Sequence, residues 1–297
     1  MRVVVAGSSG FLGGAWSQGL VEHGHDVVRL VRREPTKPDE VRWDPARGEV
    51  DQDVVDGADV VANLAGAPVV HLPWSSSYER TFVASRVDTT RTLAEAVARS
   101  PRKPALLAQS GVAAYGDCGG TVLTEESPMD ADTFMGDVVR RWEAATAPAQ
   151  EAGARVVVMR TSVVLDRRGG ALRAMLLPFR LGLGGRIGDG KQFFATISLQ
   201  DWLGAATFLA QNDLSGPFNL TGPEPSTNAE FTKVLGDALG RPTFMRVPSL
   251  PLRATRVVGP MGGEVLASQR IEPARLLDAG YAFAHNDVRD RVASALR

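Results

Sequence analysis

The chain has 297 residues, 44% of them hydrophobic, so it can bury a sizeable core in one large or two modest domains. Its 33 basic and 34 acidic side chains give a net charge of −1, and this balance provides no overall field that would favour nucleic acid or an anionic membrane. Cys118 is the only cysteine, which excludes an internal disulfide and a cysteine metal cluster and fits a reducing compartment.

Targeting segments and metal sites are not expected. The first apolar strand follows Met1 directly, which leaves no room for a secretory signal, and no apolar run approaches the ~20 residues of a membrane span. We therefore expect a cytoplasmic protein without a membrane partner. Of the four histidines, only His23 and His25 are close together, and their spacing of two suits a loop rather than a metal site.

Three glycines follow the apolar strand at residues 3–6. Gly7, Gly10 and Gly13 are spaced GxxGxxG rather than GxGxxG. A glycine at the turn allows a positive φ, one at the helix start lets a pyrophosphate approach the backbone, and the third lets the helix pack closely on the strand. Since the N-terminus of the following helix offers free N–H groups, the pattern predicts a dinucleotide-binding turn.

The second strand ends in arginine. Apolar spacing predicts a helix over residues 11–22 and a second strand over 26–31, which Arg32 and Arg33 follow. At this place in a dinucleotide fold an acidic residue binds the ribose 2′-hydroxyl, whereas an arginine binds a 2′-phosphate. Arg32 therefore favours NADP, while Glu34 leaves NAD as the alternative.

Strands and helices alternate further along the chain. Strands are predicted over 41–44, 58–64, 105–109 and 155–159, and helices over 78–98 and 135–147. This alternation predicts a doubly wound parallel α/β sheet of the Rossmann type. The small residues of Leu64-Ala65-Gly66 and the hydroxyl of Ser110 follow two of these strands, at the edge where a ligand would lie.

After Thr161 the composition changes. Residues 181–192 are rich in glycine and predict a flexible loop, either a connector or a flap beside a substrate, and a helix is predicted over 228–239. We expect a nucleotide-binding domain over residues 1–165, completed by a segment near 198–220, and a smaller C-terminal substrate lobe within residues 166–297.

Motifs in a specific order carry a family resemblance over almost the whole length. They are GSSGFLG at 7–13, WDP at 43–45, NLAG at 63–66, SRVDTTRTL at 85–93, SGVAAYG at 110–116, RRWEAA at 140–145, GGALRAMLLPFRLGLGG at 169–185, NAEF at 228–231 and RIEPARLLDAGYAF at 270–283. In this order they resemble the extended short-chain dehydrogenase/reductases, and more closely the atypical branch of nucleoside-diphosphate-sugar epimerase-like proteins.

The resemblance implies an NADP-binding Rossmann domain and assigns cofactor contacts by position. Arg32 would meet the 2′-phosphate, and Arg86 would approach the phosphates or ribose. Leu64, Ala65 and Gly66 would lie along the cofactor, and Thr161 to Val163 would flank the nicotinamide. The residues that would hold the pyrophosphate are Gly7, Ser9, Gly10, Phe11, Leu12 and Gly13.

The catalytic pair of the wider group is missing. In that group a tyrosine exchanges the proton, a lysine four residues later lowers its pKa, and a serine steadies the substrate hydroxyl. Here Met135 and Val139 stand at the tyrosine and lysine positions. Ser110 remains as the serine, and Tyr115 is the candidate acid or base, with Arg140 or Arg141 as its cation.

Two functions remain open. Ser198 stands where relatives would have a histidine, and Arg186 and Lys191 are candidates to clamp an anionic substrate, or else solvated loop charges. One function is an NADP-dependent oxidoreductase or epimerase-like enzyme acting on a small hydroxyl or carbonyl compound. The alternative is a non-catalytic, NADP-binding regulatory protein, linked to cell division as labels on some relatives suggest. For either function we expect a monomer or homodimer that does not bind nucleic acid.

Overall fold

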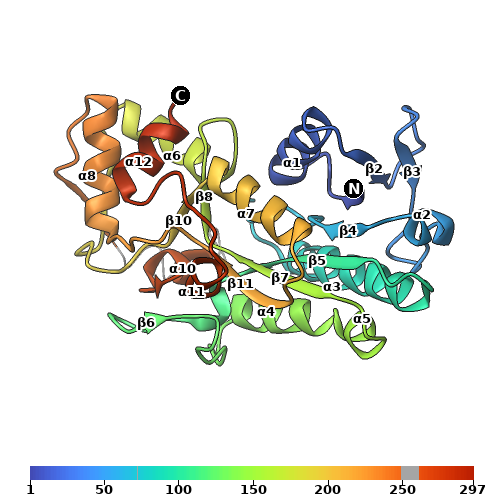
Figure 1. Cartoon of the computed structure of the whole chain (residues 1–297). Helices are drawn as coiled ribbons and strands as arrows, with labels where there is room; N and C mark the ends of the chain where they lie inside the picture. The colour runs from blue at the N-terminus through green and yellow to red at the C-terminus, as the bar shows by residue number, and fades with distance from the viewer. Residues whose placement is uncertain (72, 249–260) are drawn as a thin grey trace.

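The computed structural model describes residues 1–71, 73–248 and 261–297, and a seven-stranded sheet runs through it (Figure 1). All neighbouring strands pair in parallel, in the order β11-β7-β5-β4-β1-β2-β3. The strands are β1 (Arg2–Ala6), β2 (Asp26–Val31), β3 (Glu40–Arg42), β4 (Val60–Asn63), β5 (Ala105–Gly111), β7 (Val156–Thr161) and β11 (Gly216–Leu220). The predicted doubly wound α/β fold is thereby confirmed.

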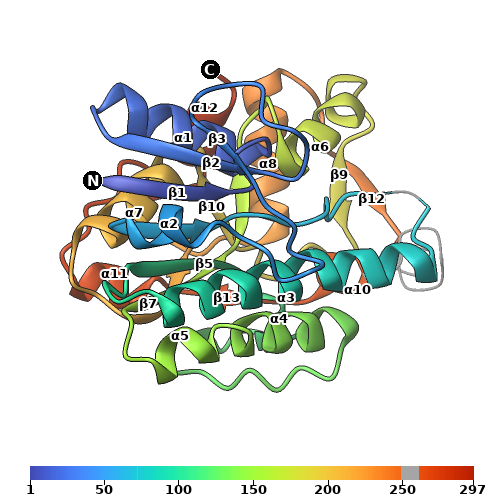
Figure 2. The same ribbon diagram turned by 90° about the vertical axis from the view of Figure 1, so that its right-hand side faces the viewer.

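Helices cover both faces of the sheet, as Figure 2 shows. One face carries α1 (Phe11–Glu22) and α7 (Leu199–Gln211), and the other carries α2 (Gln52–Asp56), α3 (Ser76–Arg99) and α5 (Ala147–Glu151), with α4 (Phe134–Ala144) packed on α3. Alternate strand residues point to opposite faces, so Val3 packs with Trp16 and Trp202 while Val4 packs with Leu93. Burial on both faces explains why the strands are continuous apolar runs.

A second lobe lies at the left in Figure 1. Its core includes Leu165, Leu172, Phe231 and Val292. The elements around this core are β8 (Val163–Leu165), α6 (Gly170–Arg180), β10 (Thr196–Ser198), α8 (Asn228–Leu239) and α12 (Val288–Ala295). The remaining short elements are η1 (Ala113–Tyr115), β6 (Val122–Leu123), β9 (Gly185–Ile187), β12 (Met245–Val247), α10 (Met261–Leu266), β13 (Arg270–Ile271) and α11 (Ala274–Asp278).

Two sequence predictions need correction. The glycine-rich stretch 181–192 is not a loop throughout, because β9 pairs in parallel with β12. A Cβ at Gly185 would lie 2.4 Å from the Met245 carbonyl oxygen, so glycine there serves close strand pairing rather than flexibility. The predicted helix 135–147 is α4, which ends at Ala144, and a separate short helix, α5, begins at Ala147 with Pro148 in its first turn.

The sheet is completed by a late segment. β11 follows α7 in the chain and pairs with β7, with Asn219 beside Arg160. On this basis we propose residues 1–165 with 198–220 as one domain and the rest of residues 166–297 as the second, with β8 at the boundary, because it pairs with β10 and packs in the core of the second lobe. Within the described ranges, no helix combines the length and apolar character needed to cross a membrane.

Candidate functional site

The turn between β1 and α1 brings two backbone segments into contact. Gly7 has a φ of +85°, and a Cβ on it would lie 2.5 Å from the carbonyl carbon of Leu64. The Leu64 N–H donates to the Ala6 carbonyl at 2.9 Å, which ties the end of β4 to the end of β1. Glycine is required at position 7 because there is no room for a side chain and because φ is positive. The backbones of Gly7 and Leu64 therefore lie against each other, with no Gly7 side chain between them, at the carboxyl ends of β1 and β4.

The N-terminus of α1 is left without a side-chain cap. Gly10 occupies the N-cap, and the first turn holds no acidic residue. Ser, Thr or Asp side chains cap α3, α4, α7, α8 and α12, whereas α6, like α1, begins at a glycine without a side-chain cap. Ser9 and Gly10 are exposed, and a Cβ on Gly13 would lie 2.3 Å from the Gly7 carbonyl oxygen. The free N–H groups of this helix start have the geometry that binds a phosphate.

The three charged residues after β2 differ in their partners. Arg33 donates two hydrogen bonds to the Glu40 carboxylate, at 2.8 and 2.6 Å, and these bonds lower the pKa of Glu40 to about 2. Glu34 pairs with Arg42. Arg32 is exposed and has no hydrogen-bond or ion-pair partner within the described part of the chain. Arg32 is thus the cation of this segment that remains available to a ligand.

The loop after β4 is held by a buried asparagine. Asn63 Nδ2 donates to the hydroxyls of Thr89 and Thr90 on α3, at 3.0 and 2.7 Å. Its Oδ1 accepts the Ala65 N–H at 3.1 Å. These three bonds satisfy most of the amide group in a buried position, and they fix residues 64–66 opposite Gly7.

Arg86 supports the same loop from behind. Its side chain is buried, and it donates to the carbonyls of Ala67 and Phe82, both at 3.1 Å, with its guanidinium carbon 3.5 Å from the centre of the Phe82 ring. A Cβ on Gly66 would lie 3.4 Å from this guanidinium carbon. Burial lowers the pKa of Arg86 to about 10, so it remains a cation at neutral pH. Among the described residues no carboxylate pairs with it.

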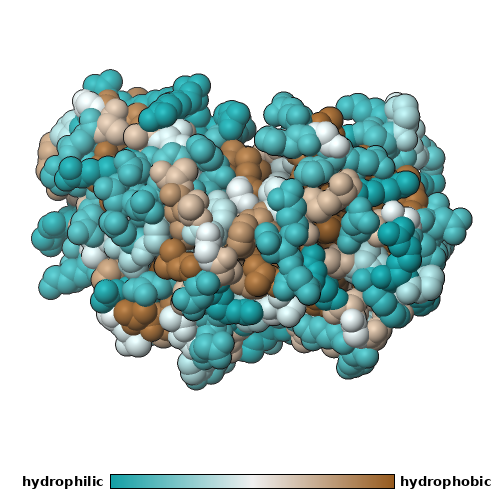
Figure 3. Space-filling model, in the orientation of Figure 1, coloured by the Kyte–Doolittle hydropathy of each residue, from teal (hydrophilic) through white to brown (hydrophobic). Residues whose placement is uncertain are grey.

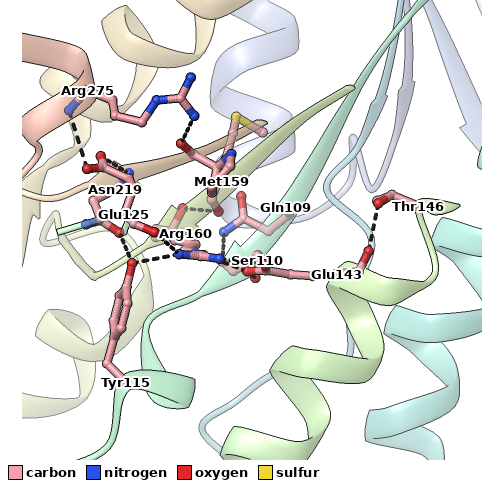
Figure 4. A network of polar contacts seen from close by, with 12 residues as sticks. Gln109, Ser110, Tyr115, Glu125, Glu143, Thr146, Met159, Arg160, Asn219 and Arg275 are labelled. Atoms are coloured by element: carbon pink, nitrogen blue, oxygen red, sulfur yellow. Dashed lines mark hydrogen bonds and ion pairs between the residues drawn. The ribbon is translucent and has the colours of Figure 1, made fainter. Parts of the chain in front are cut away.

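Ser110 belongs to a buried ion-pair network (Figure 4). Its hydroxyl donates to Glu143 Oε1 at 2.7 Å. Glu143 in turn accepts two hydrogen bonds from Arg160, at 2.9 and 3.0 Å. Ser110 is 2% exposed, and its hydroxyl points toward α4, where its partner Glu143 lies. The network therefore joins β5, α4 and β7.

Tyr115 lies at the other end of the network, and here the predicted cation is wrong. The Tyr115 hydroxyl donates to Asn219 Oδ1 at 2.8 Å and accepts from Arg160 Nη1 at 2.9 Å. Arg140 instead donates to the carbonyls of Met129 and Ala131, and Arg141 pairs with Asp137. The reason is the strand order. β7 lies between β5 and β11, so Arg160 on β7 is close to Tyr115, which follows β5, and to Asn219 on β11. Burial raises the pKa of Tyr115.

The positions of the missing tyrosine and lysine are apolar in three dimensions as well. Met135 and Val139 are buried in a cluster with Phe82 and Ala113. Val139 Cγ2 would lie 3.7 Å from a Cβ on Gly111, at the end of β5. Unlike Glu143 further along α4, these two side chains cannot transfer a proton.

The segment between the sheet and the second lobe contains Thr161 and Val163. The Thr161 hydroxyl accepts from the Trp202 indole N–H at 3.0 Å, and Val163 begins β8. Further along, Ser198 caps α7, and its hydroxyl lies 3.0 Å from Nδ1 of His285. His285, from the distant C-terminal segment, therefore lies beside Ser198 and Asp201.

Sequence reasoning missed Glu125, Arg160, Asn219 and His285. Of these four residues, only Arg160 could have been recognised from the sequence, because a charged residue inside the apolar run VVVMRT requires a buried partner. The Glu125 carboxylate accepts the Asn219 backbone N–H at 2.8 Å and lies 94 residues from it in the chain. In the described residues no group of three or more His, Cys, Asp or Glu side chains could hold a metal.

The chain matches two family models. The NAD dependent epimerase/dehydratase family model covers residues 3–172, and a domain of unknown function (DUF1731) covers residues 247–295. An epimerase family protein of Mycobacterium tuberculosis is 41% identical over 295 residues, which are 99% of this chain and 97% of the relative. The mouse epimerase family protein SDR39U1 is 40% identical, over 97% of both chains.

Solved structures agree with this relationship. The crystal structure of human epimerase family protein SDR39U1 with NADPH superposes with a TM-score of 0.89 at 36% identity, covering 99% of both chains. The nucleoside-diphosphate sugar epimerase from Corynebacterium glutamicum gives a TM-score of 0.80 at 35% identity, over 100% of this chain and 58% of that one. Since the first family model spans more than half of the sequence and full-length relatives exceed 30% identity, the chain belongs to the NAD dependent epimerase/dehydratase family.

Proposed function

We propose that this protein binds NADP(H) at the carboxyl edge of the sheet, with the pyrophosphate at the start of α1. The observation that carries the proposal is the uncapped helix start beside Gly7, where a Cβ would collide with the Leu64 backbone. The human relative at 36% identity was crystallised with NADPH, which supports the choice of ligand. The residues proposed to hold the pyrophosphate are Gly7, Ser9, Gly10, Phe11, Leu12 and Gly13.

The other contacts follow from the same placement. We assign Leu64, Ala65 and Gly66 to the cofactor side of the β4 loop, with Arg86 providing positive charge behind it. Thr161 and Val163, at the end of β7 and the start of β8, are the proposed nicotinamide contacts. Arg32 is the proposed partner of the 2′-phosphate, since Arg33 and Glu34 are each engaged by another side chain.

Arg32→Ala is expected to weaken NADPH binding by about 10- to 100-fold, because one charge-assisted contact to the 2′-phosphate is worth about 1.5–3 kcal/mol. NADH binding should change less than about threefold, since NADH lacks that phosphate. Titration of cofactor fluorescence measures both affinities. Arg33→Ala is the matched control, and equal losses for NADPH and NADH in Arg32→Ala would refute the assignment.

For the reaction we propose an oxidoreductase or epimerase-like activity on a small hydroxyl or carbonyl compound. The bound nicotinamide would supply or accept a hydride at C4, and the chain would hold and orient the substrate beside Gly111. A non-catalytic NADP-binding role is the second candidate, and the apolar Met135 and Val139 favour it. The names of the relatives reported above mention no cell division, and that link forms no part of the proposal.

Replacing Ser110 tests whether its hydroxyl contacts the substrate or only stabilises the fold. Its hydroxyl is buried on Glu143, so Ser110→Ala is expected to lower the melting temperature by about 2–4 °C while NADPH turnover changes less than about threefold. Absorbance at stoichiometric protein, with a panel of carbonyl compounds, gives the turnover. A hundredfold loss of turnover at unchanged stability would instead make Ser110 a catalytic residue. Tyr115→Phe tests in the same way whether Tyr115 is the acid or base.

A wild-type protein that binds NADPH but oxidises it with none of these compounds would support the non-catalytic candidate. Binding and turnover are therefore measured on the same preparation.

A further inference from the structure

Large hydrophobic side chains are exposed together on one side of the second lobe. Nine such side chains are exposed among the described residues, and five of them belong to the end of α6, the turn before β9, and β12. They are Leu177 (66% exposed), Leu181 (65%), Leu183 (54%), Phe244 (83%) and Met245 (40%). Exposed hydrophobic side chains are ordinarily scattered singly, so this concentration, which we call the α6–β12 surface, indicates an interaction site.

The backbone brings these side chains together. One stripe of α6 is buried in the core of the second lobe, so Leu177 and Leu181, four residues apart, share the outer face of the helix. The Leu183 N–H donates to the Pro178 carbonyl at 2.9 Å, which turns the chain directly into β9. Because β9 pairs with β12, the end of α6 and both strands are adjacent, at the right of the molecule in Figure 2.

Positive charge surrounds the α6–β12 surface. Residues 167–188 and 238–248, which form it, contain no Asp or Glu. The exposed arginines that form no ion pair with any described residue here are Arg173, Arg180, Arg241 and Arg246. On the neighbouring α8, Asp237 pairs with Lys233, and Glu230 is engaged in the capping box of the helix. This side is therefore basic, although the whole chain carries a net charge of −1.

The charge of the α6–β12 surface determines which partner suits it. A second copy of the chain, related by a two-fold axis, would place these arginines against the same arginines, and the repulsion disfavours that arrangement. A negatively charged partner is favoured instead. The surface of an anionic bilayer fits both features, because its phosphate groups attract arginine while protruding apolar side chains such as Phe244 enter the boundary between headgroups and acyl chains.

We propose that the α6–β12 surface docks this protein peripherally on an anionic membrane. Its leucine, phenylalanine and methionine side chains enter the headgroup region, and the four arginines lie at the level of the lipid phosphates with their apolar stems against the surface. The even overall charge of the sequence conceals this site, because the basic residues come together only when α6, β9 and β12 pack side by side. The proposal is independent of the proposed cofactor site, to which none of these side chains belongs.

Co-sedimentation of the full chain with lipid vesicles tests the proposal. The vesicles contain phosphatidylcholine alone or phosphatidylcholine with about one-third phosphatidylglycerol, which carries the negative charge. We expect binding to the anionic vesicles at low salt to be tighter than binding to the neutral vesicles by about 10-fold or more, because only the former attract the arginines. Most of this binding should be lost at about 1 M salt, where the screening length falls to about 3 Å.

Two variants separate the apolar from the charged contribution. Phe244→Ser removes the most exposed of the apolar side chains and should weaken binding to anionic vesicles by about 10-fold. The double variant Arg180→Gln with Arg241→Gln should weaken it by about 25-fold, since each basic side chain near an anionic surface contributes about fivefold.

Leu277→Ser and Arg91→Gln are the matched controls. Leu277 is 47% exposed on α11, which lies at the opposite side of the molecule in Figure 2, and Arg91 is an exposed residue of α3 that forms no ion pair among the described residues. Both controls should bind anionic vesicles like the wild type. Thermal unfolding and NADPH titration of every variant show that the exposed substitutions leave the fold intact.

Three results would overturn the proposal: no binding of the wild type to anionic vesicles, equal binding to neutral and anionic vesicles, or wild-type binding in either Phe244→Ser or the arginine double variant. Sedimentation velocity without lipid examines the second copy as occupant. A dimer that the wild type forms and Phe244→Ser does not, together with no vesicle binding, would assign the α6–β12 surface to self-association instead.

Discussion

Gly13→Ala is expected to weaken NADPH binding by about two orders of magnitude and to lower the free energy of unfolding. The new Cβ would lie 2.3 Å from the Gly7 carbonyl oxygen and 2.8 Å from its carbonyl carbon. Both are backbone atoms that cannot rotate away, so α1 must move off the turn, at a cost of about 1–3 kcal/mol. Displacing the turn also misaligns N–H groups that would hold the phosphates, and losing two such bonds accounts for the change in affinity.

Gly19→Ala is the matched control, because it makes the same substitution in the same helix. A Cβ there meets no atom within 4 Å, so the change should stabilise the protein by about 0.5–1 kcal/mol through helix propensity. Urea unfolding and cofactor titration on both variants separate the steric effect from propensity. Wild-type NADPH affinity in Gly13→Ala would show that the turn is not the phosphate site.

Glu143→Ala is expected to be the most destabilising change in the polar network, at about 3–5 kcal/mol. The side chains of Arg160 and Glu143 are 8% and 16% exposed, so removal of the carboxylate leaves a buried cation without its charge partner. It also removes the acceptor of the Ser110 hydroxyl. Because whole domains are stable by only about 5–15 kcal/mol, urea unfolding should show a large fall in the midpoint.

Asp137→Ala is the matched control for Glu143→Ala. Asp137 and Arg141 form an ion pair on the same helix, but their side chains are 53% and 55% exposed, so the loss should be no more than about 0.5 kcal/mol. The double variant Glu143→Leu with Arg160→Met should recover part of the stability lost in Glu143→Ala. Equal effects of Glu143→Ala and Asp137→Ala would show that the buried pair contributes nothing beyond a surface pair.

The main errors of the sequence interpretation have one cause, which is that contacts between distant segments leave no local pattern. Arg140 and Arg141 are close to Tyr115 in sequence, yet Arg160 donates to its hydroxyl, because β5 and β7 are adjacent in the sheet. In the same way, β9 was predicted as loop because its partner β12 lies about 60 residues later in the chain.

The sequence by itself determined the fold and the glycine-rich turn that we propose as the cofactor site. A positive φ at Gly7, the lack of room for a Cβ at Gly13 and the apolar strands are requirements that single residues or short runs meet, so they can be recognised without a structure. Only the tertiary structure decided which charged side chains are paired with each other and which are available to a ligand. It engages Arg33 with Glu40 and Glu34 with Arg42 but leaves Arg32 without a partner among the described residues, because charge pairing depends on distances that folding creates.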